Sequence, residues 1–188
     1  DYDIKMQDGK ERFLNMSVED FRKDSAGQYL PDYYYDTWKY MYQNWTWKDP
    51  NDPRRKEELK GWDNSLRLIK MLDDADVPLI AGSDVPAGPY LMAGVSVHEE
   101  MEIYRKAGLS PWRALRTATV SPAMAIGMLG KIGEIRPGAF ADLVFTLENP
   151  IKNLKTLRKP VAVMTHGVLL NEAKLGAMLE KQKEVVRK

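Results

Sequence analysis

Hydrophobic residues between positions 56 and 76 recur at the spacing of one helix face, with mostly polar residues between them. The face comprises Leu59, Trp62, Leu66, Ile69 and Leu72. This period is typical of an amphipathic helix. The next run, residues 77–81, is largely apolar and ends at Gly82-Ser83-Asp84. A helix followed by such a strand predicts an α/β unit whose strand is buried on both faces.

Three more helices are predicted in residues 90–129. The first spans residues 90–107 and ends at Gly108, a residue well suited to the position after a helix. Ser110-Pro111 and Ser121-Pro122 each fit the N-cap and first position of a further helix.

From Gly130 onward the pattern changes to short strands separated by turn residues. Strands are expected at residues 142–147 and 161–165. His166-Gly167 is typical of a hairpin turn leading into a third strand, residues 168–170. Asn171 is expected to cap a final amphipathic helix that runs to about Val186.

The charge pattern excludes several classes of function. The chain has 28 basic and 27 acidic residues, interspersed, with a net charge of +1. A nucleic-acid-binding surface would show a basic face or stripe instead. No apolar run reaches the length of a membrane span. Zero cysteines exclude disulfides and thiolate ligands but leave the compartment open, cytoplasmic or exported.

A series of motifs follows the expected apolar strand. In order along the chain they are Gly82-Ser83-Asp84, His98-Glu99, Lys106-Ala107-Gly108-Leu109-Ser110-Pro111, Ala118-Thr119-Val120-Ser121-Pro122-Ala123 and Arg136-Pro137-Gly138-Ala139-Phe140-Ala141-Asp142-Leu143. From about Asn64 to Leu179 the chain resembles the C-terminal part of the metal-dependent amidohydrolase superfamily, in its imidazolonepropionase and Xaa-Pro dipeptidase-like branch. The resemblance implies an α/β fold: the last strand and helices of a TIM-type (β/α)8 barrel in residues 1–129, then the C-terminal half of a small β-sandwich with a C-terminal helix in residues 130–188.

The resemblance also implies an activity, which is hydrolysis of a C–N bond in an amide or cyclic amide by a metal-activated water. Asp84 matches the aspartate at the end of the eighth strand, which contacts the metal and accepts a proton from that water. A carboxylate at the carboxyl end of a barrel strand suits this role. Two interpretations of His98 stay open. In the first it lies near the substrate or supports the site, and in the second it is a structural histidine. Glu99, Glu100 and Glu102 are expected to line a solvated helix face.

Length limits the resemblance. A complete (β/α)8 barrel needs roughly 250 residues, and this chain has 188. Members of the family take metal ligands from a His-x-His pair, but the two histidines here, His98 and His166, form no such pair. We therefore expect a C-terminal fragment whose divalent metal, zinc by resemblance, takes its other ligands from outside the chain. The alternative is a non-catalytic fragment or binding module that keeps only the scaffold.

The expected partners follow from the same resemblance. They are a small-molecule or peptide-like amide substrate and, for the fragment, a second copy or the missing part of the barrel. The aromatic residues 29–47 allow two interpretations. In the first interpretation they form a lid that faces the substrate, and in the second they form a helix that packs through one face. That face would comprise Tyr34, Trp38, Met41, Tyr42 and Trp45.

Overall fold

The computed structural model describes residues 17–23, 27–45, 51–85 and 91–186. Its helical elements fall into an N-terminal group, a long connecting helix, a central group and a C-terminal helix. They are α3 (Val18–Lys23), the 3-10 turn η1 (Gly27–Tyr29), α4 (Asp32–Trp45), α5 (Pro53–Asp74), α6 (Ser96–Lys106), α7 (Pro111–Thr117), α8 (Val120–Ala125), the 3-10 turn η2 (Leu154–Arg158) and α9 (Glu172–Val186). The strands are β1 (Leu143–Phe145), β2 (Ala162–Thr165) and β3 (Val168–Asn171).

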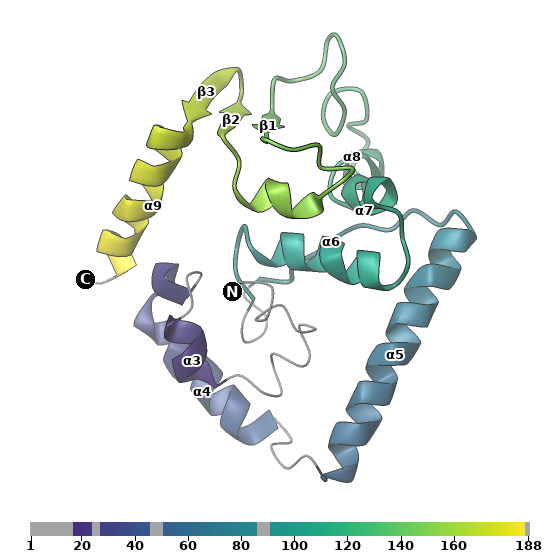
Figure 1. Cartoon of the computed structure of the whole chain (residues 1–188), viewed down its shortest axis with the longest axis vertical. Coiled ribbons are helices and arrows are strands. Elements are labelled where there is room, and N and C mark those ends of the chain that lie inside the picture. Colours follow the sequence, from purple (N-terminus) through teal and green to yellow (C-terminus); the bar gives the residue numbers. More distant parts are fainter. Residues whose placement is uncertain (1–16, 24–26, 46–50, 86–90, 187–188) are drawn as a thin grey trace.

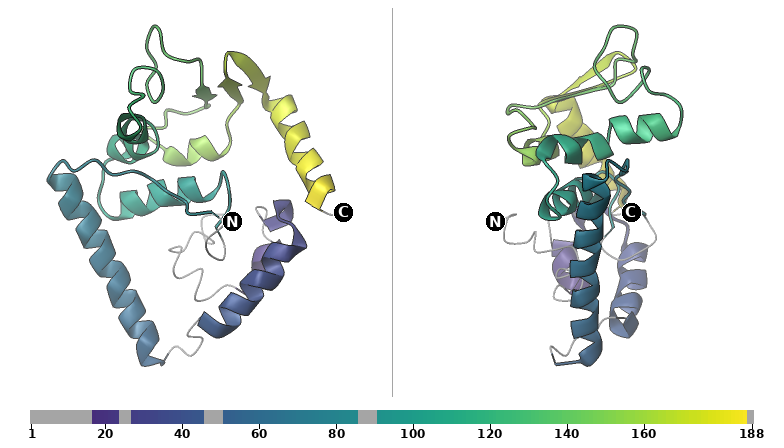
Figure 2. Two further views of the ribbon diagram at one scale, coloured as in Figure 1. Left: turned by 180° about the vertical axis from the view of Figure 1, so that it is seen from behind. Right: turned by 90° about the vertical axis from the view of Figure 1, so that its right-hand side faces the viewer.

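These elements form an open frame (Figure 1). Helix α5 lies along one side, and α3, α4 and α9 lie along the other. Helix α6 crosses between the sides, with α7, α8 and the strands beyond it (Figures 1 and 2). The frame is narrow when seen edge-on, as the right-hand view of Figure 2 shows.

Helix α5 confirms the helix predicted from the first hydrophobic period. It begins at Pro53, earlier than the predicted Lys56, because Asp52 caps it by accepting a hydrogen bond from the Arg54 backbone N–H at 2.9 Å. Four members of its apolar face are half-buried, namely Trp62, Leu66, Ile69 and Leu72, and Ile69 packs against the core around α6. The side chain of Leu59 lies outside the described residues.

The segment after α5 differs from its prediction. Residues 77–84 have no regular secondary structure and pair as a strand with no described segment. Leu79 and Ala81 pack against the core around α6, whereas Val77 and Ile80 are 42% and 45% exposed. The prediction of burial on both faces is therefore wrong for this structure. A strand needs hydrogen-bonding neighbours, and the described residues cover only one face with helices.

The helices of the central group test the predicted boundaries. Gly108, at φ +105°, follows the C-cap of α6 as predicted, and the Ser110 hydroxyl caps α7 by accepting from the Arg113 N–H at 3.2 Å. Helix α6 begins at Ser96 and not near Tyr90, because Gly94 has a left-handed φ of +75° that a right-handed helix cannot include. Residues 86–90 lie outside the described residues.

The predicted cap at Ser121 is wrong. Helix α8 begins two residues earlier than predicted, at Val120 with Thr119 as its N-cap, and Pro122 lies inside its first turn. A proline is tolerated there because the first N–H groups of a helix have no partner within it.

The C-terminal strands form one antiparallel sheet in the order β1-β2-β3. Val163 of β2 pairs with Val144 on one side and Leu170 on the other. The predicted hairpin turn is confirmed, since His166 and Gly167 have φ of 49° and 78°, the left-handed values that a tight two-residue hairpin requires. The Asn171 side chain accepts from the Lys174 N–H at 3.1 Å at the start of α9, as expected of a cap.

The aromatic segment folds as the packed helix α4. Trp38 is 1% exposed and lies 5.5 Å from the Phe21 ring, edge to face. Tyr35, absent from the predicted face, is also buried, and Met92 completes this core. Tyr34 and Met41 pack against it, while the side chains of Tyr42 and Trp45 lie outside the described residues. These contacts show helix packing; the lid interpretation stays untested.

Candidate functional site

Asp84 lies at the carboxyl end of the apolar segment that follows α5. Its side chain is exposed, and its φ of 50° is in the left-handed region, which residues other than glycine seldom adopt. Aspartate tolerates this conformation better than most residues do. The backbone therefore turns sharply at Asp84 and presents its carboxylate at the end of the segment. Strained backbone of this kind is frequent at functional sites.

Two side chains one helical turn apart on α6 lie beside the segment that ends at Asp84. The Tyr104 hydroxyl donates a hydrogen bond of 2.9 Å to the Ile80 carbonyl oxygen, four residues before Asp84. Glu100 also hydrogen-bonds with Tyr104. Burial raises the pKa of the Glu100 carboxyl, its hydrogen bond with Tyr104 opposes the rise, and the negative charge of Asp84 adds to it. Burial and the adjacent Glu100 raise the pKa of the Tyr104 phenol.

Glu100 corrects an expectation. It is half-buried, and its pKa is affected by the charge of Asp84, so the expected solvated face does not describe it. Sequence reasoning missed both Glu100 and Tyr104. Their spacing of four residues on the helix after Asp84 was the available signal.

His98 lies one half-turn before Glu100 on α6. Its Nδ1 atom is buried and has no hydrogen-bond partner among the described residues. Burial lowers the pKa of His98, the positive charge of Arg158 in η2 lowers it further, and Glu99 raises it. The structure thus places His98 beside η2. The role of His98 stays a prediction.

The described residues do not by themselves make a metal site. No group of three or more His, Cys, Asp or Glu side chains in residues 17–23, 27–45, 51–85 and 91–186 could hold an ion. Asp84 supplies one carboxylate with Glu100 near it, which is fewer ligands than zinc or another divalent ion takes. A metal at Asp84 would need further ligands from outside the described residues.

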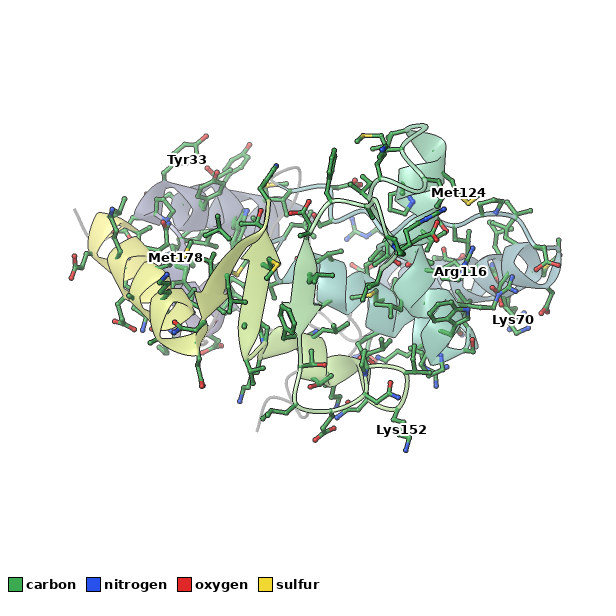
Figure 3. All side chains as sticks on the ribbon, turned by 90° about the horizontal axis from the view of Figure 1, so that it is seen from above. Tyr33, Lys70, Arg116, Met124, Lys152 and Met178 are labelled. Carbon is green, nitrogen blue, oxygen red and sulfur yellow. The ribbon has the colours of Figure 1, made fainter. Side chains whose placement is uncertain are left out.

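A cleft of about 380 Å³ lies at the other end of the same segment, near Val77 and Leu79. Its walls include Trp112, Arg116 and Met124. Figure 3 shows Arg116 and Met124 on the same side of the molecule as Lys70, with Tyr33 and Met178 at the far side. Asp84, His98 and Glu100 do not line it, so the cleft and the carboxylate are separate features.

Comparison with known proteins identifies the family. The model of the amidohydrolase family matches residues 47–170, the part of the chain that carries α5, Asp84, the central helices and the sheet. The chain belongs to the amidohydrolase family. This confirms the resemblance drawn from the motifs.

Individual relatives match parts of this amidohydrolase chain. It is 28% identical over 106 residues to an ochratoxinase from Aspergillus niger, covering 55% of this chain and 21% of that protein. A bottromycin amidohydrolase structure covers 97% of this chain and 38% of its own, with a TM-score of 0.72 at 24% identity. A Xaa-Pro dipeptidase structure covers 56% of this chain and 25% of its own, with a TM-score of 0.49 at 22% identity.

The structural match establishes the fold class. The family and the bottromycin amidohydrolase structure give a TIM-barrel-type α/β fold, as expected. The chain spans about a fifth of the length of the ochratoxinase that it matches, 21%. No helix in the described part of the chain has the length and apolar character to cross a membrane.

Proposed function

We propose that this chain is the C-terminal part of a metal-dependent hydrolase that cleaves the C–N bond of an amide or cyclic amide. Residues 1–129 would complete the barrel, and residues 130–188 would supply half of a β-sandwich with its helix. Membership of the amidohydrolase family supports the reaction class. The three-stranded sheet of β1, β2 and β3 supports the second part of the division.

The observation that carries the proposal is the place of Asp84. It stands at the carboxyl end of the apolar segment after α5, which by family resemblance corresponds to a barrel strand, and TIM-barrel enzymes carry their catalytic groups at that end of a strand. Its left-handed backbone and exposed side chain leave the carboxylate accessible to a water molecule and a substrate. In the reaction, Asp84 takes a proton from the attacking water as general base.

A divalent metal, zinc by family resemblance, would lower the pKa of a bound water and so supply the nucleophile. Asp84 would be one of its ligands. Because the described residues form no complete site, the remaining ligands would come from elsewhere in the enzyme. The substrate is proposed at the level of class only, as a small-molecule or peptide-like amide.

Substitution of Asp84 in the enzyme that contains this chain tests the proposal. Asp84→Asn keeps the shape of the side chain but removes its basicity. We expect kcat to fall about 10²–10⁴-fold, with a smaller change in KM, because the proton moves only on the way to the transition state. Steady-state kinetics and metal analysis of both proteins measure the effect.

Asp76→Asn is a matched control. Asp76 is also exposed and left-handed, with φ of 55°, but it stands at the opposite end of the same segment and pairs with Arg113. This variant should keep a near-normal kcat. His98→Asn should also cost much less than Asp84→Asn if His98 is structural. Near-normal turnover by Asp84→Asn, together with an inactive but folded and metal-loaded His98→Asn, would show that Asp84 is not the general base.

The incomplete ligand set favours one alternative, a binding module that keeps the scaffold without catalysis. Metal analysis of the enzyme that contains this chain separates the two, because the proposed function takes the remaining ligands from outside the 188 residues. Stoichiometric zinc would favour a catalytic site and argue against a bare scaffold.

A further inference from the structure

One peptide group near Asp84 is held from both sides. The carbonyl oxygen of Ile80 accepts the hydrogen bond from the Tyr104 hydroxyl at 2.9 Å. The N–H of Ala81, which belongs to the same peptide group, donates to the Thr117 carbonyl oxygen at 2.9 Å. Since a peptide group is planar, bonds to its two opposite ends fix its rotation about the chain.

The two bonds come from different helices. Thr117 is the last residue of α7, where carbonyl groups have no partner within the helix. Tyr104 lies on α6 and is only 6% exposed, packed among Leu109, Ala114 and Leu154. Thr117 accepts through its backbone carbonyl, so the Tyr104 hydroxyl is the side-chain group of the two that hold this peptide group.

We propose that Tyr104 is a positioning residue for Asp84, because its hydroxyl fixes the Ile80–Ala81 peptide group and thereby the direction in which the segment presents the Asp84 carboxylate. The proposal rests on the proposed role of Asp84. The distance along the chain is short, since only Gly82 and Ser83 lie between Ala81 and Asp84. Among the described residues this segment has no strand partner that could hold it instead.

Tyr104→Phe removes one hydroxyl group and leaves the packed ring in place. In the enzyme that contains this chain, we expect kcat to fall about tenfold, since small misplacements of a catalytic group cost rate more than binding. KM should change less than about twofold. Tyr33→Phe, which removes a hydroxyl from a side chain that is 71% exposed, is the matched control and should leave both constants unchanged.

A double variant separates positioning from a general structural role. If Tyr104 acts through Asp84, Tyr104→Phe should cost almost nothing further in an Asp84→Asn background, because there is no base left to orient. Equal losses of kcat in both backgrounds, or normal turnover by Tyr104→Phe beside an impaired Asp84→Asn, would overturn the inference while leaving the proposed function intact. Normal turnover by Asp84→Asn would contradict both this inference and the proposed function.

Amide hydrogen exchange of the 188-residue chain tests the geometry without any activity. The Ala81 amide should exchange about tenfold faster in Tyr104→Phe than in the parent, since loss of one hydrogen bond loosens the shared peptide group. The Ala107 amide, bonded to the Ile103 carbonyl at the end of α6, is the internal control and should not change. An unchanged Ala81 rate, or equal acceleration at Ala107, would contradict the arrangement.

Discussion

At the scale of single residues, the candidate site combines an exposed group with half-buried ones. Asp84 faces solvent at a sharp backbone turn, while Glu100 and His98 are half-buried on α6. Burial acts oppositely on the two types of group, raising the pKa of the Glu100 carboxyl and lowering that of the His98 imidazole. Both shifts disfavour the charged form, and because His98 and Glu100 lie a half-turn apart, they do so on different sides of α6.

The lowered pKa of His98 predicts a pH dependence of stability. The folded protein binds the His98 proton less readily than the unfolded chain, whose ordinary value is 6.5. The contribution of neutral His98 to the free energy of unfolding is therefore fully present above the pKa of the unfolded chain. It is lost as the pH falls through the lower pKa of the folded protein. Denaturant unfolding of the 188-residue chain at a series of pH values, from about 7.5 to about 5, should show this loss.

His98→Asn should flatten that part of the curve. Comparison with the parent isolates the effect, because the raised pKa of Glu100 acts in the opposite direction and is common to both proteins. His166→Asn, whose parent side chain is 86% exposed, is the matched control and should keep the parent's slope. A His98→Asn curve that parallels the parent's throughout would argue against the burial of His98.

At the scale of elements, the aromatic core joins α3 and α4 to the segment in front of α6. Phe21, Trp38 and Met92 come from three separate stretches of chain and meet in one buried cluster. Met92 also donates its N–H to the Ser96 hydroxyl at 2.9 Å, at the start of α6. The aromatic helix therefore supports the residues directly in front of α6, around Met92.

Trp38→Ala should destabilise the chain strongly. The Trp38 side chain is almost completely buried, and truncation of such an aromatic residue costs about 3–5 kcal/mol. Tyr33→Ala, on the exposed face of the same helix, should cost less than about 0.5 kcal/mol. Chemical denaturation with circular dichroism compares the two, and similar losses for both would mean that α4 is not packed through Trp38.

At the scale of the whole molecule, the Asp84 carboxylate and the two histidines do not form a catalytic centre within the described residues. His98 and His166 lie on α6 and in the hairpin turn, and neither joins Asp84 in a group of ligands within the described residues. We predict that the purified 188-residue chain has no amidase or peptidase turnover. Assays with added zinc test this. Metal-dependent turnover by the chain alone, abolished by Asp84→Asn, would refute the interpretation as a fragment.

The exposed apolar surface predicts self-association. Val144 in β1 and Val168 in β3, the edge strands of the sheet, are 55% and 58% exposed, and Ile80 in the unpaired segment is 45% exposed. Unpaired strand edges with apolar side chains invite pairing with another chain. Light scattering should show mass increasing with concentration. Val144→Lys should reduce the increase, Tyr33→Lys on α4 should not, and a monomer at all concentrations would contradict the prediction.

Local patterns in the sequence were sufficient for several of the elements and for the family. The period of α5, the caps at Ser110 and Asn171, and the turn at His166-Gly167 depend on neighbouring residues, so the sequence predicted them correctly. The ordered motifs likewise identified the amidohydrolase family. The late start of α6, set by the left-handed Gly94, needed the backbone conformation, because glycine alone does not specify which φ it adopts.

Only the tertiary structure decided the environment of each residue. The apolar run before Asp84 is exposed on one face and unpaired, because burial and strand pairing depend on segments distant in sequence. The proximity of Glu100 to Asp84 and the bond from Tyr104 to Ile80 likewise join α6 to a separate segment. Sequence patterns record which residues share a helix face, whereas contacts between elements arise from packing, which no local period contains.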